Sequence, residues 1–190
     1  LGGTAFNANN FNINGNLLVK TVASGGADTI TLHGTTNILG ATAATKTIDI
    51  TETGDTLAAT AAQLTGATVT DTATSNVTVT ALGNTAFNAD NFSIAGNLLV
   101  QTVSAAGDVT LNASTNIVGA TAASKTISIT DDDTLTGTAA QLTGVAVTDA
   151  GTANVTVTAL GNTAFDASNF SIAGNLIVQT GRSGGGGTIT

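Results

Sequence analysis

The sequence predicts an all-β fold, a parallel β-solenoid built from long sequence repeats, each of roughly 80 residues. Three observations lead to this prediction: one long stretch occurs three times, short apolar–polar alternations recur along the chain, and only 3% of residues are aromatic and 8% charged. Self-similarity at a fixed period is typical of repeat architectures, in which each unit packs against its neighbours. Abundant Thr, Val and Ile favour an ordered chain over a disordered one.

The repeated stretch defines the organisation of the chain. It reads LGGTAFNANNFNINGNLLVK at 1–20, LGNTAFNADNFSIAGNLLVQ at 82–101 and LGNTAFDASNFSIAGNLIVQ at 160–179. The chain therefore divides into repeat unit 1 (residues 1–81), repeat unit 2 (82–159) and a partial repeat unit 3 (160–190). No Pro- or Ser-rich linker separates the units, so we expect one continuous solenoid rather than independent domains.

Alternating segments mark the expected strands. In TISIT at 126–130, Ile127 and Ile129 share one face and the hydroxyl side chains point the other way. Val155 and Val157 repeat this pattern in NVTVTA. A period of two indicates a strand with one buried face. By contrast, we expect no helix in TAAQL, because Thr and Gly flank this short helix-favouring segment.

Stacked coils would bring like side chains together along the axis. We expect roughly 19 to 20 residues per coil, hence about four coils per repeat. Asn91 and Asn169 suit the corners, because Asn tolerates a left-handed backbone. The aromatic residues occur in pairs that would stack or fill a corner, among them Phe87 with Phe92 and Phe165 with Phe170.

Tandem antiparallel β-sandwiches are the alternative fold. A unit of this length is short but sufficient for an immunoglobulin-like sandwich. Such sandwiches usually centre on a large buried aromatic residue, and one Phe pair per unit is a thin core for them. The solenoid is therefore the favoured prediction.

Composition excludes several classes of function. The net charge is −8, and the basic residues are only Lys20, Lys46, Lys125 and Arg182, which argues against nucleic-acid binding. No apolar run is long enough for a transmembrane helix, so no membrane span is expected. The absence of Cys excludes disulfide bonds and thiolate metal sites.

Residues with catalytic or metal-binding chemistry are few, and we expect no enzyme and no cofactor. The single histidine, His33, has no partner Cys or second His, which favours a solvent-facing residue. No G-x-S-x-G elbow or phosphate loop occurs. Asp131, Asp132 and Asp133 are the one candidate metal site, for calcium, because carboxylate oxygens suit this ion. A solvated turn is the favoured interpretation of these three residues.

The Thr-, Ala-, Asn- and Gly-rich composition, with strands such as VTVT and TISIT, resembles that of bacterial surface β-solenoid proteins. These include filamentous-haemagglutinin-type adhesins, S-layer proteins and the repeat regions of RTX-type proteins. Asp133-Thr134-Leu135-Thr136-Gly137 is similar to the D-x-L-x-G half of an RTX calcium repeat, whereas the GGxGxD half is missing.

This resemblance implies an extracellular, cell-surface protein. We expect a structural segment that associates with copies of itself, end to end or laterally, into a fibre, sheath or surface layer. Sparse charge and the absence of Pro do little to discourage such association. The alternative function is the stalk of an adhesin that presents a separate binding tip. Contacts with the cell surface or its matrix are the other expected partners.

Overall fold

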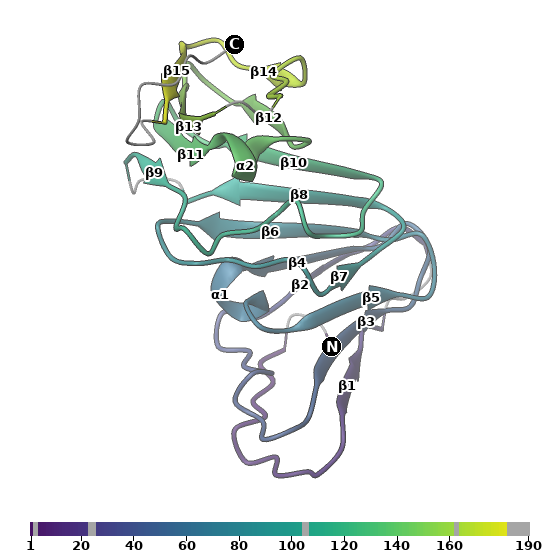
Figure 1. Cartoon of the computed structure of the whole chain (residues 1–190). Coiled ribbons are helices and arrows are strands. Elements are labelled where there is room, and N and C mark those ends of the chain that lie inside the picture. Colours follow the sequence, from purple (N-terminus) through teal and green to yellow (C-terminus); the bar gives the residue numbers. More distant parts are fainter. Residues whose placement is uncertain (2–3, 23–25, 104–106, 162–163, 182–190) are drawn as a thin grey trace.

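The computed structural model describes residues 1, 4–22, 26–103, 107–161 and 164–181 of the chain. Within these residues the chain forms fifteen short strands and two helices of one turn each. The strands follow one another along the long axis of the molecule, from β1 near the bottom of Figure 1 to β15 at its top. Within each sheet, the order of the strands in space follows their order in the sequence.

The elements of repeat unit 1 are β1 (Leu17–Lys20), β2 (Thr29–Thr31), β3 (Lys46–Ile50), β4 (Thr56–Thr60), α1 (Ala61–Leu64), β5 (Thr68–Asp71) and β6 (Asn76–Leu82). Those of unit 2 are β7 (Phe92–Ser93), β8 (Asn97–Thr102), β9 (Val109–Thr110), β10 (Ser124–Ile129), β11 (Thr134–Thr138), α2 (Ala139–Leu142), β12 (Ala146–Asp149) and β13 (Asn154–Leu160). Unit 3 contributes β14 (Phe170–Ser171) and β15 (Leu176–Thr180), and its residues 182–190 lie outside the described part.

These strands form three sheets. The N-terminal sheet has the order β1-β3-β5-β7, the central sheet β14-β12-β10-β8-β6-β4-β2, and the C-terminal sheet β15-β13-β11-β9. Consecutive strands along the chain therefore alternate between the central sheet and one of the other two. Each sheet pairs strands that are two apart in the sequence, and the pairing between the named strands is parallel throughout.

The predicted fold class is wrong. The strands are divided among three parallel sheets with two helices, an α/β-like layout that is not clearly a β-solenoid. The N-terminal sheet ends at the two-residue strand β7, which is followed by an isolated bridge from Ser93 to Thr121 rather than by β9. Antiparallel sandwiches are wrong as well, because the named strands pair in parallel.

The expectation of one uniform coil length is also wrong. Thr56 pairs with Asn76, whereas Leu17 pairs with Lys46. The second pair is separated by clearly more residues along the chain than the first. More residues separate β1 from its partner β3 because the segment between β2 and β3 runs through turns and isolated bridges before β3 begins. Loops of this kind tolerate length changes that a strand does not.

Equivalent strands lie seven apart in the order along the chain: β8 is the equivalent of β1, and β15 is the equivalent of β8. Because seven is odd and consecutive strands alternate between sheets, equivalent strands of successive repeats fall in different sheets. β1 lies in the N-terminal sheet, β8 in the central sheet and β15 in the C-terminal sheet. The same sequence is thus observed in three different surroundings.

The core lies on the inward faces of the strands and confirms the period-two prediction. Ile127, Ile129, Val155 and Val157 are fully buried, while Ser128 and Thr156 between them are only partly covered. Parallel strands align these apolar side chains in columns, as where Val77 pairs with Leu98. The result is one continuous apolar cluster running through all three sheets.

The two helices contradict the expectation for TAAQL, and a capping box explains them. The backbone N–H of Gln63 donates to the Thr60 hydroxyl at 3.2 Å, and the Thr60 N–H donates to Gln63 Oε1 at 3.0 Å. Gln63 Nε2 also donates to the carbonyl of His33 at 2.8 Å. The helical turn is therefore held by contacts with a distant loop, and Thr138 with Gln141 repeats the arrangement around α2.

Candidate functional site

The three aspartates singled out as a calcium candidate follow β10, and their side chains have different environments. Asp132 Oδ1 accepts the backbone N–H of Thr152 at 2.7 Å and its hydroxyl at 3.1 Å. These bonds, the backbone one foremost, lower the pKa of the Asp132 carboxyl from its ordinary 3.8. Asp131 is exposed, and Asp133 immediately precedes β11. Asp132 thus holds two turns together across neighbouring layers.

Asp133 and its unit 1 equivalent, Asp55, share one unusual property. In each, the Oδ2 atom is buried and has no hydrogen-bond partner among the described residues. Asp55 Oδ1 accepts the backbone N–H of Asp28 at 3.0 Å. Within the described residues, no group of three or more His, Cys, Asp or Glu side chains is arranged to hold a metal ion.

The predicted structural aromatics form close pairs. Phe87 and Phe92 are buried, with ring centroids 5.8 Å apart and planes at 79°. Phe165 and Phe170 repeat this edge-to-face geometry at 5.9 Å and 80°, but they are only half-buried. Edge-to-face pairs place the positive ring edge on the negative ring face, which fixes the relative orientation of the two side chains.

Asn91 and Asn169 are exposed, and their backbone carbonyls accept the N–H groups of Val69 and Val147 at 3.2 and 3.3 Å. The left-handed backbone proposed for Asn is wrong, because Ala81 and Ala159 are the non-glycine residues with positive φ in the described part of the chain. A different Asn motif closes the turns: the Asn88 side chain accepts the N–H of Asp90, two residues on, at 2.7 Å.

Ala81 and Ala159 mark an irregularity that recurs in each repeat. Ala81 has φ of 56°, and the pairing of β6 with β8 shifts register between Val79 and Leu82. Ala159 has φ of 54°, within the same shift between β13 and β15. Such bulges bend a strand and redirect its side chains. Sequence alone gives little sign of them, since Ala is not a residue that favours positive φ.

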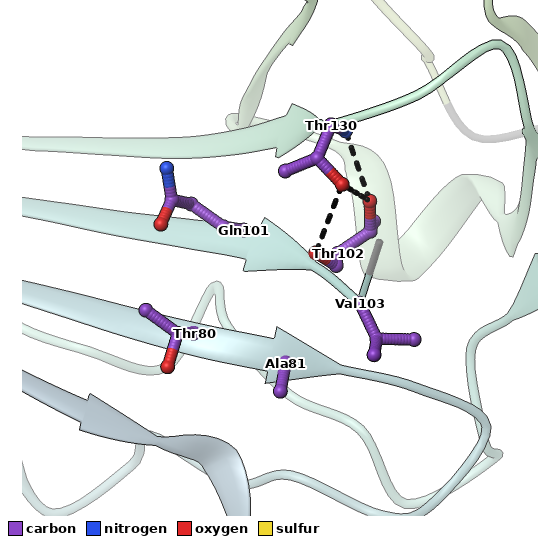
Figure 2. A pocket seen from close by; sticks show the side chains of 6 residues that line it. All are labelled: Thr80, Ala81, Gln101, Thr102, Val103 and Thr130. Carbon is purple, nitrogen blue, oxygen red and sulfur yellow. Dashed lines mark hydrogen bonds between the residues drawn. The ribbon is translucent and has the colours of Figure 1, made fainter. Parts of the chain in front are cut away.

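A shallow pocket of about 270 Å³ opens beside the first bulge, near the ends of β6, β8 and β10 (Figure 2). Its lining consists of Thr80, Ala81, Gln101, Thr102, Val103 and Thr130. The Thr130 N–H donates to Thr102 Oγ1 at 3.1 Å, and the Thr130 hydroxyl donates to the Thr102 carbonyl at 3.2 Å. Both hydroxyl groups are thus used in holding β8 to the segment after β10, and Thr21 with Thr51 does the same in unit 1.

A second depression, of about 470 Å³, lies beside helix α2. It is lined by Asn88, Ala113, Ser114, Thr115, Asn116, Ala140 and Gln141. The amides along it are engaged within the protein: Asn116 Nδ2 donates to Asp90 at 2.6 Å, and Gln141 Nε2 donates to the Asn112 carbonyl at 2.7 Å. His33, the unit 1 counterpart of Asn112, is exposed and bonded to Thr35, in agreement with the expected solvent-facing position.

The described residues that line the two pockets offer hydroxyl and amide groups but no carboxylate, imidazole or amine. No helix in the described residues is long and apolar enough to cross a membrane. Comparison with protein-family models, with curated proteins and with solved structures found no match.

Proposed function

We propose that this chain is a structural segment that associates with copies of itself and builds a fibre, sheath or surface layer outside the cell. The observation that carries the proposal is the chemistry of the sheet edges. β14 and β15 carry no charged side chain, and Leu176, Ile177 and Val178 of β15 are exposed. Charge and Pro are the usual means by which proteins prevent edge-to-edge pairing, so such an edge favours association.

The opposite end of the molecule supports the same proposal. Edge strand β1 carries a single charge, Lys20, whose ammonium lies 3.6 Å from the Asp49 carboxylate. Leu18 and the neighbouring Phe11 and Ile13 are exposed there. Large exposed apolar side chains gathered at an edge are typical of interaction surfaces.

Self-association is tested on the purified chain by sedimentation velocity and negative-stain electron microscopy over a concentration series. We expect the average mass to rise with concentration and elongated particles to form, because association through sheet edges has no built-in stop. A single monodisperse species at every concentration would contradict the proposal and favour the stalk of an adhesin instead.

The calcium candidate at Asp131 to Asp133 has its own test. We expect no resident metal, because Asp132 is already bonded to Thr152 and because the described residues hold no suitable group of ligands. The thermal midpoint, followed by circular dichroism, should therefore be the same in calcium and in chelator. A midpoint that rises with calcium concentration would restore the calcium site, since a ligand that binds only the folded state stabilises it.

A further inference from the structure

Five tripeptides of the chain have the sequence Asn-X-Ser or Asn-X-Thr, in which the Asn side chain can accept a glycan through its nitrogen. They begin at Asn76, Asn91, Asn112, Asn154 and Asn169. A chain so rich in Asn and Thr contains such tripeptides by composition alone. The fold therefore decides which of them a glycosyltransferase can reach.

Four of the five tripeptides are built into strands. Their hydroxyl residues lie in β6, β7, β13 and β14, and are Thr78, Ser93, Thr156 and Ser171. The middle residue of each packs in the core: Val77 and Val155 are 0% exposed, Phe92 is 1% exposed, and Phe170 is partly buried against the apolar cluster. Glycan transfer at these positions first requires the strand to leave its neighbours, which costs the free energy of local opening.

The tripeptide Asn112-Ala113-Ser114 is different, because it forms a turn between β9 and β10 (Figure 1). All three residues are exposed. Asn112 Oδ1 accepts the backbone N–H of Ser114 at 3.0 Å, and the Asn112 carbonyl accepts Gln141 Nε2 at 2.7 Å. Asn112 Nδ2 has no hydrogen-bond partner among the described residues. A glycan on this nitrogen therefore leaves intact the bonds that hold the turn.

We propose that Asn112 is an N-glycosylation site, with an oligosaccharide linked to a lipid diphosphate as the donor. The new bond joins Asn112 Nδ2 to the anomeric carbon of the first sugar, the bond from that carbon to the lipid diphosphate breaks, and one amide proton is released. The inference rests on the proposed location outside the cell, because such glycans are carried by surface loops of secreted proteins.

The surroundings of the turn leave space for a sugar. The depression beside α2 borders the turn, since Ala113 and Ser114 belong to its lining. The other lining residues are small or uncharged and polar: Asn88, Thr115, Asn116, Ala140 and Gln141. The first sugar thus meets no charged and no large apolar side chain there, in keeping with its own uncharged hydroxyl groups.

Unit 1 contains the same turn without the acceptor amide. His33-Gly34-Thr35 occupies the equivalent position and is exposed. His33 Nδ1 accepts the N–H of Thr35 at 3.2 Å, as Asn112 Oδ1 accepts that of Ser114, and the His33 carbonyl accepts Gln63 Nε2 at 2.8 Å. His33→Asn therefore converts this turn into a further Asn-X-Thr tripeptide and should create a second acceptor site.

The test is glycosylation of the purified, folded chain. The enzyme is an oligosaccharyltransferase that, with its lipid-linked oligosaccharide, glycosylates a synthetic peptide of residues 109–118. Intact mass and peptide mapping should show one glycan per chain, at Asn112, with occupancy at least about tenfold above that of the four strand tripeptides, because each of these needs local opening.

Three variants complete the experiment, and unchanged circular dichroism spectra and melting midpoints establish that each is folded. Ser114→Ala removes the hydroxyl of the tripeptide but keeps Asn112, and should abolish the addition. Thr35→Ala makes the same kind of change in the equivalent turn of unit 1 and should leave one glycan. His33→Asn should raise the number to two.

Two results would overturn the inference. One is a folded chain that stays unmodified under conditions in which the peptide is glycosylated, because the turn would then be inaccessible to the enzyme. The other is comparable occupancy at a strand tripeptide of the folded chain, since exposure would then not select the site. Neither result depends on association between chains, so the sedimentation experiment tests the proposed function separately.

Discussion

Replacing Phe87 by Ala should destabilise the protein by about 3–5 kcal/mol, the cost typical of removing a buried Phe. The side chain is 0% exposed and packs edge to face on Phe92 at 5.8 Å. The surrounding layers are held by parallel backbone pairing, so the cavity cannot readily collapse. Because the chain lacks Trp and Tyr, unfolding in urea is best followed by far-ultraviolet circular dichroism.

The repeat supplies a matched control for this substitution. Phe165 is the equivalent of Phe87 in unit 3 and has the same aromatic partner geometry, but it is only half-buried. Phe165→Ala should therefore cost less, about 1–2 kcal/mol by the area it removes from contact. If both variants lost the same free energy of unfolding, the greater burial of Phe87 would not be what determines the cost of removing its side chain. Comparison of the m-values checks that unfolding remains cooperative.

The local strand pattern was readable from the sequence because it depends on neighbours along the chain. Alternation at Ile127 and Ile129 identified the buried face, since side chains of a strand point to opposite faces at a period of two. The division into three sheets was not readable in this way. It depends on which strands, distant in the sequence, become neighbours. It also depends on the turns between β2 and β3, which increase the number of residues between β1 and its partner β3.

Helix α1 was missed although the sequence contained its signal. Thr60 and Gln63 have the spacing of a capping box, and this outweighs the flanking Thr and Gly. The positive φ values at Ala81 and Ala159 had no such signal, because they follow from the register shift and not from the residue type. Adjacent aspartates were likewise a poor guide to a site, since Asp132 contacts Thr152 while the Oδ2 atom of Asp133 is buried.

Substituting Gly96 by Ala should destabilise the protein by about 1–3 kcal/mol, through overpacking against backbone. A Cβ atom at this position would overlap the carbonyl oxygen of Ser75 and lie 2.7 Å from Asn76 Oδ1. The Ser75 carbonyl belongs to the neighbouring layer, just before β6, so it cannot move aside as a flexible side chain would. The loss is measured by urea unfolding, as for Phe87→Ala.

The equivalent glycines separate this packing effect from the conformational effect of a glycine substitution. Gly174→Ala should be destabilising for the same reason, because its Cβ would overlap the Ala153 carbonyl. Gly15→Ala should be neutral or slightly stabilising in the isolated chain, since its Cβ would meet nothing and Ala restricts the unfolded state. If all three substitutions had the same effect, the close approach of successive layers would not be what selects glycine at this position of the repeat.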